Sequence, residues 1–381
     1  MSESNDPRGF PDPAAAPAEF ASLHALAARS QAAATRDRAT ELDADIRATL
    51  MAFLAPGQGD RLAAVFATAP SVATYRHLWR LLAQCEQETS LAGTLNVTVF
   101  ALPIVIVAGI ETDGAAPTSL PGVLPGAKAL AGLLREHRAL SGNQSFALAN
   151  GLVAAGALDL AQLPDLLATR ALPEAASATR ALEPAPIVLS VGPETVHLRF
   201  LLGSALAAPG ADVLRDASVG KWGLPFAQAL GRELAAPGVS VLALPRAPQS
   251  LLHAVHAGRA AQREVGAHIF AANAIRKLRA SVGEPTAVIS AHRTNAAVNG
   301  GELRLSLSSP FDPREAEGFR CPIYPLENVA EVVAMLTDFL GECRVSDVRV
   351  LPGIHGDRDP ATGVPLLFKG DGLQASVPAV H

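Results

Sequence analysis

The chain is poor in the residues that identify several whole classes of protein. It has only three cysteines among 381 residues, Cys85, Cys321 and Cys343, and they are far apart in the sequence with no CxxC pair. This usage supports neither a disulfide framework nor a zinc ribbon, and it fits a reducing compartment. The first residues also lack the basic and apolar regions of a signal peptide. We therefore expect a cytoplasmic protein with no structural metal.

The sequence also lacks the short motifs of the best-known enzyme classes. It contains no GxxxxGK[ST] loop, no GxGxxG after a predicted strand, no GxSxG, no HExxH and no EF-hand loop. Each of these motifs carries a defined phosphate, nucleophile or metal chemistry. Their absence predicts no cofactor, although many enzymes work without a short motif.

The chain also has a small net charge and a low fraction of charged residues. The formal net charge is −5 and charged residues make up 18% of the chain, so no global field attracts a polyanion. The predicted strand Glu302 to Ser308 carries no aromatic residue on its polar face, and base stacking therefore has no platform there. We expect no sequence-specific binding to nucleic acid.

The run from Leu95 to Ile110 is the most informative apolar segment. It is shorter than the roughly 17 to 25 residues that a membrane-spanning helix needs, and it is rich in β-branched residues. Pro103 interrupts it, and the nearest charges are acidic rather than basic. The pattern predicts a pair of buried strands with Pro103 at their boundary or in a bulge, and no membrane span.

Composition along the chain predicts two domains. Residues 1–22 are expected to be a disordered leader, and residues 23–170 to form a mainly helical domain that contains the buried strand pair. The alanine- and proline-rich segment 171–186 has no hydrophobic period and is interpreted as a linker. Residues 187–372 then form an α+β domain, followed by a tail over residues 373–381.

The second domain shows a regular alternation of elements. Strands and helices are predicted in the order β-α-β-β-α-β, over Val239 to Leu244, Gln249 to Ser281, Ala287 to Ala291, Glu302 to Ser308, Leu326 to Leu340 and Asp347 to Leu351. This order matches the ferredoxin-like plan, in which two helices cover one face of a four-stranded sheet. The predicted fold class is α+β.

Five polar residues are the candidates for chemistry. His292 follows a predicted strand and could be a general base, while Arg293 could hold an anionic substrate through a bidentate contact. His355, Asp357 and Asp359 follow the predicted strand Asp347 to Leu351 and could bind a divalent cation or act as an acid/base pair. Both groups also fit turns, which select glycine, asparagine and aspartate for backbone reasons.

Two functions of different class follow from these patterns. The first is a non-catalytic interaction or assembly component, which binds a protein partner or a second copy through the polar, small-residue face of its sheet. The second is a small-molecule hydrolase or transferase acting on an anionic substrate through the five residues named above. Convergence of those five side chains on one concave pocket would favour the enzyme.

Overall fold

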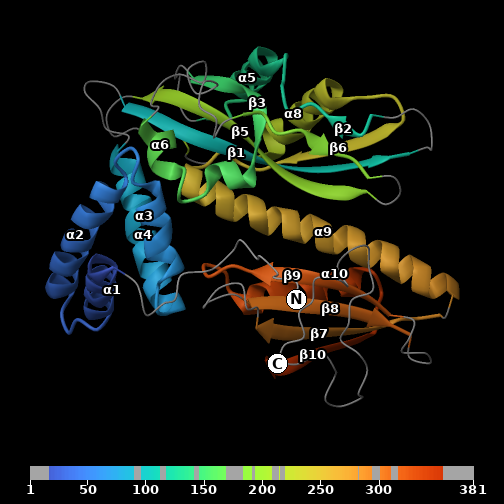
Figure 1. The fold of residues 1–381 in the computed structure, drawn as a ribbon. Coiled ribbons are helices and arrows are strands. Elements are labelled where there is room, and N and C mark those ends of the chain that lie inside the picture. Colours follow the sequence, from blue (N-terminus) through green and yellow to red (C-terminus); the bar gives the residue numbers. More distant parts are fainter. Residues whose placement is uncertain are drawn as a thin grey trace, which may run out of the picture. The chain divides into compact units, whose positions relative to one another are not determined.

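The structure is a computed structural model, and it describes residues 17–89, 96–111, 117–140, 146–168, 183–190, 194–207, 214, 219–281, 283–293, 301–309 and 316–354. The chain is mixed α+β, as predicted (Figure 1). It forms two compact units. Unit 1 consists of Met1–Thr89 with Leu160–Ala168, and unit 2 of Ser90–Asp159 with Thr169–His381.

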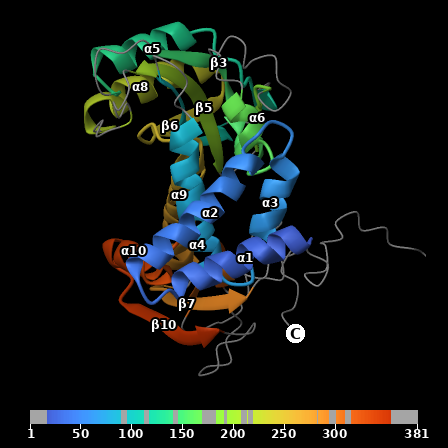
Figure 2. The ribbon, with the colours of Figure 1, turned by 90° about the vertical axis from the view of Figure 1, so that its left-hand side faces the viewer.

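The described part of unit 1 is helical. Its elements are α1 (Ala18–Gln31), α2 (Arg36–Phe53), α3 (Gly59–Ala67), α4 (Val72–Thr89) and α6 (Leu163–Ala168). Helices α1, α2 and α4 lie side by side (Figure 2). Their buried side chains recur every three or four residues, as in Leu42, Ile46, Leu50 and Phe53 of α2, so that each helix turns one apolar stripe inward. The first of these helices begins inside the segment that we predicted to be a leader.

A polar contact joins three of these helices. The Asp43 carboxylate on α2 accepts hydrogen bonds from Ser30 Oγ of α1 at 2.5 Å and from Arg80 Nη2 of α4 at 3.0 Å. His77 Nε2, also on α4, lies 2.9 Å from the same carboxylate. The Asp43 side chain is 19% exposed, so this is a partly solvated charge with three partners.

Unit 2 contains two four-stranded sheets. Sheet I has the order β3-β5-β1-β6, with β1 (Asn96–Ile110), β3 (Phe146–Ala154), β5 (Thr195–Ala207) and β6 (Val239–Pro245), all antiparallel. Helices α5 (Ala127–Glu136) and α8 (Val219–Leu234) cover one face, and the first part of α9 (Leu251–Ser281) covers the other (Figure 1). Burial on both faces explains why β1 is apolar at nearly every position. Two short strands, β2 (Ser119–Leu120) and β4 (Ile187–Val188), pair with each other, and a 3₁₀ turn spans Ala155–Leu158.

The buried apolar segment is one strand rather than a strand pair. β1 pairs with β5 without a register shift from Asn96↔Ala207 to Ala108↔Thr195, and Pro103 lies opposite Phe200 within that ladder. The Pro103 carbonyl accepts a hydrogen bond from the Arg246 N–H at 2.8 Å, just beyond the end of β6. In a strand, the N–H and the carbonyl of one residue point to the same side, so the N–H that proline lacks would also face Arg246. The pairing of β1 with β6 ends at Ile104↔Pro245, and the missing N–H therefore interrupts no pair of that ladder. Within the described residues, no helix has the length and apolar character needed to cross a bilayer.

Sheet II has the order β10-β7-β8-β9. Its strands are β7 (Thr286–Arg293), β8 (Gly301–Ser308), β9 (Ala316–Ile323) and β10 (Asp347–Ile354); the first three are antiparallel neighbours, and β10 is parallel to β7. The second part of α9 and α10 (Val329–Glu342) pack on one face of the sheet. Their core includes Leu303, Leu305 and Leu307, which alternate along β8 with polar residues.

The predicted ferredoxin-like plan is not the arrangement found. The strand predicted at Val239 to Leu244 is β6, which pairs with β1 in sheet I, while β9 takes the edge of sheet II beside β8. A strand pattern identifies a strand but not its partner, and non-local pairing decides the sheet.

The compact units also differ from the predicted domains. Strands β1 and β3 precede the segment that we interpreted as a linker, yet both pair with β5, which follows it. Of that segment, residues 171–182 lie outside the described residues, as do residues 1–16 of the predicted leader and the predicted tail.

Candidate functional site

The structure describes only part of the predicted site. His292 lies in β7 and its side chain is buried, while Arg293 ends the same strand and pairs in register with Gly301. His355, Asp357 and Asp359 lie outside the described residues. Whether the five side chains share a pocket therefore stays a prediction.

The polar face of sheet II brings together a serine and a histidine. Ser290 and His292 are two residues apart on β7, so they project from the same face, and Ser290 Oγ lies 2.7 Å from His292 Nε2. A hydrogen bond between a hydroxyl and an imidazole is the first requirement for an activated nucleophile. The two residues are only 1% and 2% exposed, however, so no substrate reaches them in this structure.

A buried charge network lies on the neighbouring strand. Glu302 of β8 accepts a hydrogen bond from Arg304 Nε at Oε1 and another from Arg320 Nε of β9 at Oε2, both at 2.7 Å. Glu302 and Arg304 are 4% and 1% exposed. Each carboxylate oxygen thus has a guanidinium partner, which compensates the loss of hydration that burial imposes on the ions.

The residues of this polar face were predicted correctly, but their burial was not predicted. Glu302, Arg304, Ser306 and Ser308 do share one face of β8, as their alternation with leucines indicates. All four are buried, so the surface that we expected to dock a partner is not open to one. Alternation assigns residues to a face and does not say whether water reaches that face.

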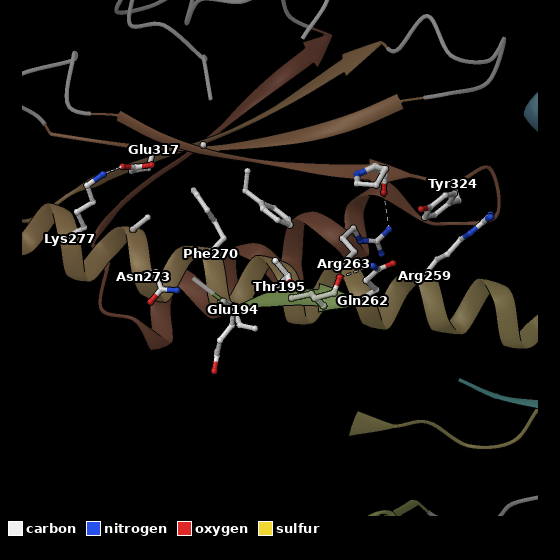
Figure 3. A pocket seen from close by; sticks show the side chains of 17 residues that line it. Glu194, Thr195, Arg259, Gln262, Arg263, Phe270, Asn273, Lys277, Glu317 and Tyr324 are labelled. Atoms are coloured by element: carbon white, nitrogen blue, oxygen red, sulfur yellow. Dashed lines mark hydrogen bonds and ion pairs between the residues drawn. The ribbon is translucent and has the colours of Figure 1, made fainter. Parts of the chain in front are cut away.

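An open groove along α9 is the surface that sequence reasoning missed. It has a volume of about 630 Å³ and is lined by residues of α9, by β9 with the turn after it, and by the first residues of β5 (Figure 3). Its apolar part includes Val196, Ile269, Phe270 and Phe319. The rings of Phe270 and Phe319 stack with centroids 5.4 Å apart, and both side chains are half-buried.

Charged side chains lie along the same groove. Lys277 Nζ forms an ion pair with the Glu317 carboxylate at one end (Figure 3). Toward the other end, Arg263 Nη1 donates to the Pro322 carbonyl at 3.0 Å and pairs with Glu327. Arg259 lies over the ring of Tyr324, with its guanidinium carbon 5.2 Å from the ring centroid.

The groove combines apolar side chains with a few charged ones. Its described lining contains no serine, cysteine, histidine or aspartate, and its one lysine is held by a glutamate. Across the described ranges as a whole, no group of three histidine, cysteine or acidic side chains is placed to hold a metal ion.

The groove could not have been found from neighbouring residues in the sequence. Its lining spans Glu194 to Tyr324 and comes from elements that belong to both sheets. One signal was present: Gly266 on α9 lets the Phe319 ring pack closely, since an added Cβ would lie 3.3 Å from that ring, closer than an ordinary van der Waals contact. Comparison of the chain with protein-family models, with curated proteins and with solved structures gives no match.

Proposed function

We propose that this protein is a non-catalytic interaction component that binds a partner protein in the groove along α9. The observation that carries the proposal is the composition of the groove, in which stacked aromatic rings form an open apolar surface with charged side chains on either side. Sites of a few hundred cubic ångströms with mostly apolar walls and a few polar groups are typical of specific binding.

The aromatic pair supplies the contact area. Phe270 and Phe319 come from α9 and β9, two elements fixed by the core of sheet II, and neither ring is fully buried. Aromatic side chains on rigid elements contribute much to binding, because they bury a large area and lose little conformational freedom. A partner that covers these rings removes apolar surface from water.

A hydrolase or transferase acting on an anionic substrate is the second candidate function. The hydrogen bond between Ser290 and His292 favours it, because this is the geometry of a nucleophile with its base. It requires access to a face where both residues are buried, and we therefore place it second.

A glycine in the groove provides the test of the first function. Leucine at position 266 would press against the Phe319 ring, because its Cβ alone would lie 3.3 Å from it, and would extend into the groove. It would also replace a residue that weakens helices by about 1 kcal/mol. We expect Gly266→Leu to stay folded with a melting temperature close to that of wild type, because the gain in helix propensity offsets the displacement of the half-buried Phe319 ring. Peptides selected on the wild-type protein from a random displayed library should bind this variant at least about tenfold more weakly.

The matched control is Gly231→Leu. Gly231 lies on α8, outside the groove, and a Cβ there meets nothing within 4 Å, so the change raises helix propensity in the same way without touching the groove. This variant should keep wild-type affinity for the selected peptides. Equal binding by Gly266→Leu, or a library that yields no binder, would refute binding in the groove.

A further inference from the structure

The groove is long enough to hold a short peptide in an extended conformation. The α9 residues that line it run from Arg259 to Lys277, a distance of about 27 Å at 1.5 Å per residue. An extended segment of about eight residues covers this length, because a strand advances about 3.3 Å per residue. A compact small molecule would occupy only part of such a site.

One wall of the groove is a sheet edge. Within the described strands, β9 pairs with β8 and has no neighbour on its other side. The Pro322 carbonyl points to that unpaired side, where it accepts from Arg263. The backbone groups of Gly318, a buried residue of the groove lining, point the same way because strand backbones repeat every two residues. Proline is tolerated in an edge strand because one side of the strand makes no ladder. Open edges of this kind pair with extended peptides.

Charge is unequal at the two ends of the groove. Lys277 and Arg263 already face Glu317 and Glu327, whereas no carboxylate pairs with Arg259 in the part of the chain that the structure describes. Glu194 does not supply one, since its side chain points away from Phe270 (Figure 3) and accepts from Ser240 Oγ at 3.3 Å. The Arg259 end is therefore complementary to an anionic group on the occupant.

We infer that the groove binds an extended segment of a partner protein that carries an apolar or aromatic anchor and an acidic side chain about five residues apart. The anchor lies against Phe270 and Phe319, and the acid pairs with Arg259. Arg259 and Phe270 are eleven residues apart on α9, about 16 Å, which five extended residues span. This inference rests on the proposed function and specifies the partner's chemistry.

A charge exchange tests the pairing. The probe is a peptide of about twelve residues, selected from the displayed library on the wild-type protein, together with its variant in which the acid is replaced by lysine. We expect Arg259→Glu to bind the acidic peptide about tenfold more weakly than wild type does, and to bind the lysine peptide more tightly than wild type does. Arg232→Glu on α8 changes the net charge equally, lies outside the groove and should leave both affinities unchanged.

Three results would overturn the inference. In the first, Gly266→Leu abolishes binding of the selected peptides, but Arg259→Glu does not reverse the preference for the acidic peptide over the lysine peptide. This result would contradict the pairing of the acid with Arg259 and would leave binding in the groove intact. Selected peptides without the spaced anchor and acid would contradict the proposed motif. A dimer in sedimentation that Gly266→Leu dissociates would place a second copy in the groove instead of a partner's segment.

Discussion

The two polar surfaces of unit 2 differ in what they offer. The polar face of β7, β8 and β9 carries a hydrogen bond between Ser290 and His292 and a separate charge network of Glu302, Arg304 and Arg320. All of these residues except the partly exposed Arg320 are buried. The groove along α9 is open and carries aromatic rings and charges, but its described lining has no nucleophile with a base. This difference is the reason that binding in the groove is the first of the two proposed functions and catalysis on the polar face the second.

The largest effect expected is on the buried carboxylate. Glu302→Gln removes the negative charge that Arg304 and Arg320 both face, and breaking a buried ion pair costs about 3 to 5 kcal/mol. We expect the free energy of unfolding, measured by chemical denaturation, to fall by about that amount. Glu317→Gln is the control, because its partner Lys277 is largely exposed and such pairs contribute about 0 to 1 kcal/mol. Similar losses for both variants would show that the polar face is open to water.

A partly solvated carboxylate should give an intermediate effect. Burial by itself would raise the pKa of Asp43, but the hydrogen bond from Ser30 and the nearby His77 and Arg80 outweigh it, so the pKa lies below its usual 3.8. The stabilisation from this charge is present above the unfolded-state pKa and is lost as the pH falls through the lower folded-state pKa. Asp43→Asn should cost about 1 to 2 kcal/mol at pH 7 and progressively less as the pH falls below about 4. A cost that is constant over this range would mean that the carboxylate charge is not what stabilises the contact.

The smallest effect concerns the serine. Ser290→Ala removes the hydrogen bond to His292 and should lower the free energy of unfolding by about 1 kcal/mol. A fluorophosphonate probe, which labels activated serines, should leave Ser290 unmodified in the folded wild-type chain because the residue is buried. Labelling of wild type that Ser290→Ala abolishes would reverse the order of the two candidate functions.

The sequence predicted individual helices and strands better than it predicted which strands pair with each other. The burial of Val105 and its neighbours followed from the apolar run, and the long helix was placed within two residues of its observed start. β9 was missed because its sequence, Ala-Glu-Gly-Phe-Arg-Cys-Pro-Ile, contains both glycine and proline and has a weak strand pattern. Its pairing with β8 compensates for that weak propensity, and such non-local pairing has no signature in a short window.

The candidate site was predictable to a smaller extent. His292 was identified because it follows a predicted strand, and the polar residues of β8 because they alternate with leucines, but the burial of these residues depends on the rest of the chain. The groove depends on α9 serving two sheets, with Gly258 against Leu198 and Phe200 of sheet I and Phe270 against Phe319 of sheet II. A helix whose apolar side changes along its length shows no single stripe, so the sequence does not reveal which of its side chains are left between the sheets.

Hydrogen–deuterium exchange on the full chain separates the two surfaces in one experiment. With a selected peptide bound, backbone amides in 259–277 and 316–324 should exchange more slowly, because the peptide covers α9 and pairs with the open edge of β9. Amides in 286–293 and 301–308 should exchange as they do in the free protein. Slower exchange confined to those two strands, with the groove unchanged, would contradict binding along α9 and assign the function to the polar face.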